Sequence, residues 1–233
     1  MQCSHLSYAS GYAAINFYKI YTAYLVPLCV LIPVLVFFSK YRFAPVKYKT
    51  IFWYLITSAS INFAGIIIAF KHQSNLWLFH VDTITESILL LFFFQKINYR
   101  TPVKVAIQMI LLLFPLACVL NLLFFQKGIE FNTYPRVIES MLFIFLAAIY
   151  WLQENNEAEN IAWSKNPLNW ILSGIILYFA SSFSLFVFSN FLLADAISRH
   201  DFYLLRIVWS VHATLLLIMY LLFSVGFYKI EKQ

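Results

Sequence analysis

The chain has 233 residues, of which 62% are hydrophobic and only 11% are charged, whereas an ordinary soluble domain has roughly 25% charged residues. Together with a mean hydropathy of +0.78, this composition excludes a soluble globular domain. The formal net charge of +6 does not indicate a nucleic-acid partner, because the basic residues stand between apolar runs, where they set the orientation of a membrane protein.

Residues 1–20 lack the charged start and the apolar core of a cleavable signal peptide. We expect them to form a short N-terminal interfacial segment. Seven apolar stretches follow, and each is long enough to cross a hydrocarbon core of roughly 30 Å as a helix. The predicted spans are residues 21–39, 50–70, 75–95, 103–125, 134–153, 168–193 and 203–227. The sequence therefore predicts an all-α fold, with a seven-helix transmembrane domain over residues 21–228 and a tail over residues 229–233.

Lysine and arginine residues are distributed unequally between the two ends of the predicted bundle. One end has Lys40, Arg42, Lys47, Lys49, Lys96, Arg100, Lys104, Lys165, Lys229 and Lys232. The other end has Lys19, Lys71, Lys127, Arg136, Arg199 and Arg206. Because cytoplasmic loops carry the excess of Lys and Arg, ten against six predicts an outside N-terminus and a cytoplasmic C-terminus.

The third predicted span contains the densest group of polar residues. His80, Asp82, Thr83, Glu86 and Ser87 cover about half of the helix surface at roughly 100° per residue. An ionisable side chain at the centre of a span costs about 2.5–3.5 kcal/mol on insertion scales, so it is expected to face protein or water. The residues after Ser87 are apolar, which places the polar arc in the outer half of the helix.

The fifth predicted span begins with a second polar face. Pro135 suits the first turn of a helix, and Arg136, Glu139 and Ser140 share one face at the spacing i, i+3 and i+4. This polar face also lies in the outer half of the membrane, where ion pairing between Arg136 and Glu139 is expected.

The seventh predicted span adds Arg206, Trp209, Ser210 and His212 across an arc of about 160°. His212 lies roughly 13 Å along this helix at the α-helical rise, which is near the expected depth of Glu86. The sixth span has a stripe of small or polar residues, which is typical of close helix packing. This stripe consists of Ser173, Gly174, Tyr178, Ser181 and Ser182.

Polar residues in the same half of three helices have two interpretations. One is an outward-facing pocket between the third, fifth and seventh helices, which binds a small ligand or protons. The other is a set of buried ion pairs that fix the helix register. The candidate ligand or proton site consists of His80, Asp82, Thr83, Glu86, Arg136, Glu139, Arg206, Trp209 and His212. No catalytic residue, metal ligand or cofactor is assigned.

Three segments resemble a family of small seven-helix bacterial integral membrane proteins without an assigned biochemical activity. They are His-x-x-Thr-x-x-Glu at His80, Thr83 and Glu86, Tyr-Pro-Arg-x-x-Glu-Ser at residues 134–140, and Trp-Ser-Val-His at residues 209–212. Asp82 departs from the pattern, because an aromatic residue is expected there. The resemblance implies a multi-pass protein of the bacterial cytoplasmic (inner) membrane. Genes of this family lie near genes of two-component signalling systems, and the resemblance therefore implies a sensory or accessory role.

Several seven-helix activities do not fit the sequence. A retinal protein needs a lysine within the last helix, but Lys229 and Lys232 follow that span. Metal hydrolases of the alkaline ceramidase type carry a His-x-x-x-His pair in the last helix, whereas Leu216 stands at that spacing after His212. A metal hydrolase and a haem between His80 and His212 are therefore minor alternatives.

The leading hypothesis is a non-enzymatic receptor, sensor or signalling accessory protein. Its loops are too short to signal alone, so we expect a membrane or cytoplasmic protein partner on the basic first and third loops and on the acidic segment from Glu154 to Glu159. One alternative is a small-solute or proton-coupled carrier with Glu86 as its protonation site. Another is an oligomeric pore or accessory subunit, in which the polar face meets a second copy of the chain.

Overall fold

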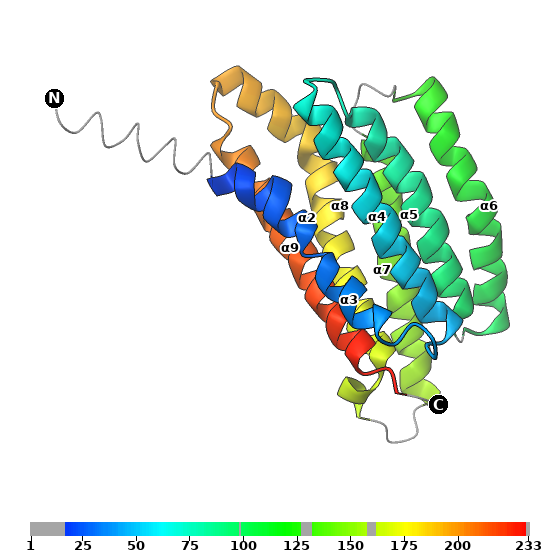
Figure 1. Cartoon of the computed structure of the whole chain (residues 1–233). Helices are drawn as coiled ribbons and strands as arrows, with labels where there is room; N and C mark the ends of the chain where they lie inside the picture. The colour runs from blue at the N-terminus through cyan, green and yellow to red at the C-terminus, as the bar shows by residue number, and fades with distance from the viewer. Residues whose placement is uncertain (1–16, 98, 127–131, 158–161, 232–233) are drawn as a thin grey trace.

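The chain folds into a bundle of long helices (Figure 1). The computed structural model describes residues 17–97, 99–126, 132–157 and 162–231, so most of the expected interfacial segment and part of the segment after Glu154 lie outside the described residues. Within the described residues, every regular element is helical. Seven helical spans are long and apolar enough to cross a membrane, which gives the chain the architecture of a multi-pass integral membrane protein.

The elements follow one another along the chain with short connections. The spans are built from η1 (Tyr21–Leu25), α2 (Val26–Leu28), α3 (Leu31–Phe38), α4 (Val46–Phe70), α5 (Leu76–Lys96), α6 (Thr101–Phe124), α7 (Thr133–Glu157), α8 (Pro167–Arg199) and α9 (Tyr203–Tyr228), with a short 3₁₀ turn, η2 (Trp163–Lys165), before α8. The start of the first span and the end of α9 lie at opposite ends of the bundle (Figure 1), as an odd number of spans requires.

Three of the observed spans differ from the predicted ranges by four or more residues at one end. The first extends from Phe17 to Phe38, and its helix is interrupted at Cys29 and Val30, where Pro33 crowds the carbonyl group four residues before it. The second starts at Val46, directly after Pro45. The sixth continues to Arg199, because the left-handed residue that ends it is His200, with φ of 54°.

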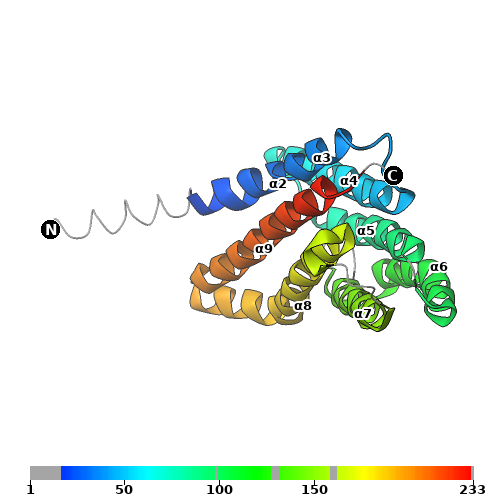
Figure 2. The same ribbon diagram turned by 90° about the horizontal axis from the view of Figure 1, so that it is seen from below.

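The order of packing places α5 and α8 at the centre of the arrangement. α5 contacts α4, α6 and α7, whereas α8 contacts α7 and α9, and α9 contacts α3 in turn. Seen from below, α3 lies beside both α4 and α9, and α6 lies at the outer edge of the bundle (Figure 2). α7 and α9 are therefore both neighbours of α8.

Phe94, Phe143 and Phe179 form an aromatic layer in the core of the bundle. The Phe94 and Phe143 rings are stacked with centroids 5.7 Å apart, and the Phe143 and Phe179 centroids are 4.9 Å apart. All three side chains have no exposed area. They come from α5, α7 and α8, so this aromatic layer packs these three helices against one another.

The connection between α5 and α6 is held against α7 by Tyr99. Its phenol donates a hydrogen bond of 2.8 Å to the carbonyl oxygen of Leu146. Burial, with a further contribution from Tyr150, raises the pKa of the Tyr99 phenol well above its ordinary value. The phenol therefore remains a protonated donor at physiological pH, and this connection stays tied to α7.

Substitution of Gly226 by alanine is expected to lower the free energy of unfolding by about 1–2 kcal/mol, as is typical of overpacking. A Cβ at this position would lie 2.9 Å from the Pro167 carbonyl oxygen and 2.9 Å from Ile171 Cγ1, so α8 and α9 would have to separate. Gly65→Ala is the matched control, because its nearest contact would be an ordinary 3.5 Å. Detergent unfolding that gave equal losses for the two variants would contradict this account.

Candidate functional site

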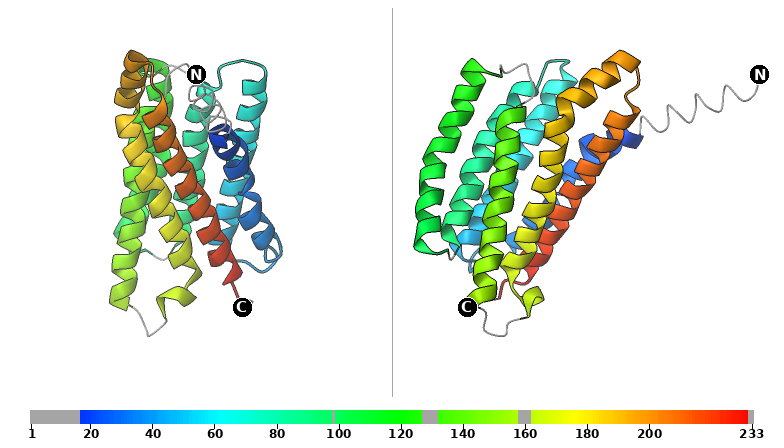
Figure 3. Two further views of the ribbon diagram at one scale, coloured as in Figure 1. Left: turned by 90° about the vertical axis from the view of Figure 1, so that its left-hand side faces the viewer. Right: turned by 180° about the vertical axis from the view of Figure 1, so that it is seen from behind.

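Arg136 lies at the centre of a buried polar cluster in the first turns of α7. α7 begins deeper in the bundle than α5 (Figure 3), and the Asn132 side chain donates hydrogen bonds to Thr83 Oγ1 at 2.8 Å and to the Phe79 carbonyl oxygen at 3.4 Å. These bonds place the start of α7 beside the polar arc of α5. Arg136 is consequently only 4% exposed, although it is near the end of its helix.

Three carboxylates surround this guanidinium group. Arg136 Nη2 lies 2.7 Å from Asp82 Oδ2, and Nη1 lies 2.8 Å from Glu139 Oε2. Nη1 also donates a hydrogen bond to Glu86 Oε2. We call these four residues the Arg136 cluster. The structure thus joins the polar arc of the third span to the polar face of the fifth.

Two tyrosines complete the surroundings of Glu86. The Tyr54 hydroxyl, on α4, donates a hydrogen bond of 2.7 Å to Glu86 Oε1. Tyr178, on α8, is a second buried phenol close to the charged groups of the Arg136 cluster. Glu86 therefore receives hydrogen bonds from two other helices, α4 and α7, which fixes the orientation of its carboxylate.

The charges of the Arg136 cluster do not balance. Within the described residues, one guanidinium group faces three carboxylates whose side chains are 18%, 3% and 0% exposed at Asp82, Glu86 and Glu139. Uncompensated charge is costly at such burial. The cluster is therefore chemically suited to take up a proton or a cationic group.

Buried oxygen atoms beside the cluster point to the same conclusion. Glu139 Oε1 and Asn132 Oδ1 are buried and have no hydrogen-bond partner among the described residues. Buried polar atoms are nearly always satisfied, and exceptions often mark a site for water, an ion or a functional group. Glu139 combines such an oxygen with a fully buried carboxylate, which makes it the cluster member with the greatest need of a proton or cation.

His212 lies in a separate polar group between α8 and α9. Its Nδ1 is 2.8 Å from Ser181 Oγ, and its ring packs against Tyr178 with a centroid distance of 5.3 Å. Trp209 contacts the His212 ring from the side at 6.1 Å. Among the described residues, the side chains that hydrogen-bond to Glu86 are Tyr54 and Arg136, not His212, so the expected proximity of His212 and Glu86 is not a direct hydrogen bond.

An aromatic path connects the two groups. The Arg136 guanidinium carbon lies 6.0 Å from the centre of the Phe186 ring, and Phe186 meets Trp209 edge to face at 6.3 Å. Phe186 therefore contacts both Arg136 of the cluster and Trp209 of α9.

Arg206 and His80 are not among the residues that bind Arg136. Arg206 lies on the side of α9 that faces the first span, where it lines a pocket with Tyr18. His80 is buried on α5, at 2% exposure. Of the nine predicted site residues, Asp82, Glu86, Arg136 and Glu139 form the cluster, and Thr83 is attached to it through Asn132.

Sequence reasoning missed Tyr54 and Asn132, and it assigned Ser181 to packing. Tyr54 stands among other aromatic residues of α4, and no pattern distinguishes it. Asn132 precedes a predicted helix, at a position where asparagine commonly caps the helix, and this was an available signal. Within the described residues, no group of three or more His, Cys, Asp or Glu side chains is arranged to hold a metal ion.

Comparisons of this chain with protein families, with curated proteins and with solved structures found no match.

Proposed function

We propose that this chain is a receptor- or sensor-like membrane protein whose Arg136 cluster binds a proton or a small cationic ligand. The observation that carries the proposal is the surplus of buried carboxylates, three against one guanidinium group. Intramembrane acidic residues are rare and commonly mark proton or ligand sites. In this proposal the bound proton or ligand is the signal, and the change in the cluster reaches α9 through Phe186 and Trp209.

The aromatic layer favours a receptor over a carrier. Phe94, Phe143 and Phe179 are fully buried and in mutual contact. Phe94 lies eight residues beyond Glu86, which is roughly 12 Å along α5 at the helical rise. A ligand that reached the cluster from the end of the bundle where α5 begins would therefore meet a packed apolar barrier before it could pass to the other end. The alternative is a proton-coupled carrier. The surplus of carboxylates in the Arg136 cluster is compatible with it if the aromatic layer opens.

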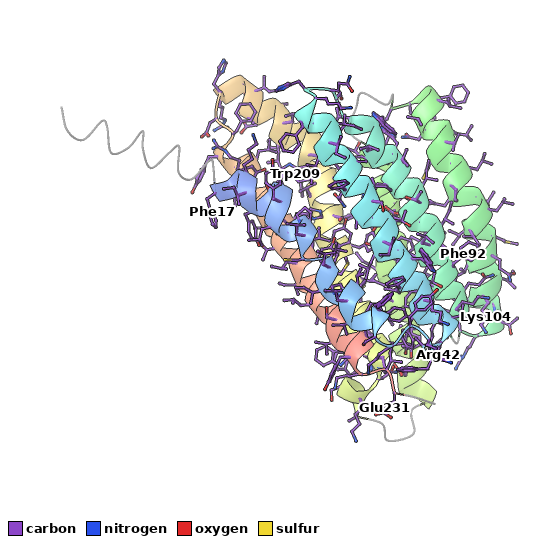
Figure 4. All side chains as sticks on the ribbon, in the orientation of Figure 1. Phe17, Arg42, Phe92, Lys104, Trp209 and Glu231 are labelled. Carbon is purple, nitrogen blue, oxygen red and sulfur yellow. The ribbon has the colours of Figure 1, made fainter. Side chains whose placement is uncertain are left out.

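We further propose that the N-terminus is outside and the C-terminus is in the cytoplasm, in the inner membrane of a bacterium. Arg136 is buried in an ion-pair cluster, so it does not act as a loop cation. The difference between the two ends in the number of Lys and Arg residues in loops therefore becomes larger. Arg42 and Lys104 lie at the C-terminal end of the bundle, whereas Phe17 and Trp209 lie in the opposite half (Figure 4). The cluster then faces the outside, and a protein partner would bind the basic C-terminal end.

Trp209 provides the means of testing the proposed site. Tryptophan fluorescence of the protein in liposomes, recorded as the outer pH is lowered, is expected to show a transition that Trp209→Phe removes. Glu86→Gln is expected to abolish this transition, because it removes one titrating carboxylate while retaining its shape. Asp195→Asn is the matched control, since Asp195 is a carboxylate on α8 that pairs with the mostly exposed Arg199.

Each result has a definite meaning. Loss of the transition in Glu86→Gln, with no loss in Asp195→Asn, would support a proton site in the Arg136 cluster. An unchanged transition in Glu86→Gln would contradict it. Acidification of the liposome interior by wild type, and not by Glu86→Gln, would favour the carrier alternative over the receptor.

A further inference from the structure

The two ends of the polar arc of α9 face different neighbours. Arg206 and Ser210 line a pocket beside the first span, whereas His212 contacts Ser181 and Tyr178 of α8. At roughly 100° per residue, His212 is about 160° from the middle of the pocket-lining face. The pocket is thus distinct from the Arg136 cluster and from the His212 group.

The pocket has a volume of about 450 Å³, within the usual range of roughly 300–1,000 Å³ for small-molecule sites. Its polar side is a row of side chains one helical turn apart, Arg206, Ser210 and Thr214, and its apolar side includes Ile207 and Val211. Tyr18 closes it from the first span. The pocket is therefore amphipathic, with a cation at one end.

The charge of Arg206 is not balanced by an acid among the described residues. Its Nε donates a hydrogen bond of 3.2 Å to the Phe202 carbonyl oxygen, and its side chain lines the pocket. The two nearest acids in the chain sequence are otherwise engaged. Asp201 accepts a hydrogen bond from the Tyr203 amide, and Asp195 pairs with Arg199.

Depth in the membrane identifies the kind of ligand. Arg206 is the fourth residue of α9, roughly 4.5 Å from its start at the helical rise, which is the level of the polar headgroups in a bilayer. Val211 lies roughly 12 Å from the same end, at the level of the acyl chains. Ile207 and Val211 are 41% and 53% exposed, so the apolar side of the pocket is open to lipid.

We propose that this pocket binds one anionic phospholipid, with its phosphate on Arg206 and the first part of an acyl chain against Ile207 and Val211. A guanidinium group binds phosphate through paired, charge-assisted hydrogen bonds, and the Ser210 and Thr214 hydroxyl groups line the same wall. Tyr21 Oη and Thr214 Oγ1, 2.9 Å apart, close the inner end. The lipid links the first span to α9 at a place where α9 leaves space beside it.

Native mass spectrometry of the protein with added phosphatidylglycerol tests this assignment. Wild type is expected to retain one phosphatidylglycerol, and to retain phosphatidylcholine about tenfold less strongly. Arg206→Gln is expected to weaken phosphatidylglycerol binding by about tenfold. Arg199→Gln is the matched control and is expected to bind as wild type does, because Arg199 is an exposed cation at the same end of the bundle that lies outside the pocket.

A second variant keeps the test decisive if Arg206→Gln does not fold. Val211→Trp fills the apolar side of the pocket and retains the cation, so it is also expected to weaken phosphatidylglycerol binding. Equal retention by wild type and a folded pocket variant would overturn the proposal, as would equal binding of the two lipids. Displacement of the lipid by soluble glycerol phosphate would show a free phosphate site and would also overturn it. These outcomes do not depend on Glu86, so they leave the proposed proton site unaffected.

Discussion

Arg136→Met is expected to lower the free energy of unfolding by about 3–5 kcal/mol, the usual loss when one partner of a buried ion pair is removed. The reason is that Asp82, Glu86 and Glu139 would remain together in the bundle without the guanidinium group that they share. Unfolding by a denaturing detergent in mixed micelles measures the loss. Arg199→Met is the matched control, because Arg199 is 74% exposed and pairs with one acid at i−4. It should cost about 0–1 kcal/mol.

Lowering the pH distinguishes the loss of charge pairing in Arg136→Met from the loss of side-chain packing. Protonation removes the negative charges that Arg136→Met leaves unpaired, so the stability of this variant relative to wild type should recover as the pH falls. Adding Glu86→Gln to Arg136→Met should restore part of the stability at neutral pH for the same reason. A deficit that neither acid nor the second substitution reduces would show that Arg136 acts through its volume and not through its charge.

Phe143→Ala is expected to cost about 2–3 kcal/mol and to make the bundle permeable to protons. Phe143 is fully buried between Phe94 and Phe179, so the substitution leaves a cavity in the aromatic layer. The lost energy is mainly packing, because lipid is as apolar as the helix interior and gives little hydrophobic driving force. Detergent unfolding measures the stability, and a pH-sensitive dye inside liposomes measures the leak.

Phe145→Ala is the matched control for Phe143→Ala, both for stability and for proton leakage. Phe145 lies on the same helix only two residues further along, but its side chain is 59% exposed. It should change the stability by less than about 1 kcal/mol, as is usual for substitutions away from the core, and leave the liposomes sealed. Sealed liposomes with Phe143→Ala would mean that the aromatic layer does not form the barrier, and the case for a receptor over a carrier would lose its main support.

The helical architecture was largely predictable from the sequence because hydrocarbon thickness fixes the length of a span. The observed α5, Leu76–Lys96, differs from the predicted 75–95 by one residue at each end. The larger errors occurred where local chemistry extends a helix beyond its apolar core. Pro45 allows α4 to begin at Val46, and α8 continues through polar residues until His200 adopts a left-handed conformation.

By itself, the sequence determined which residues are costly to bury and which of them share a helix face, since both follow from side-chain chemistry and the helical period. Arg136 and Glu139 are paired on α7, as their spacing indicates. Only the tertiary structure decided which helices meet, because lipid-facing and helix-facing apolar surfaces have the same composition. α8 lies against both α7 and α9. The polar residues of α9 are therefore divided between two neighbours. His212 faces α8, and Arg206 faces the first span.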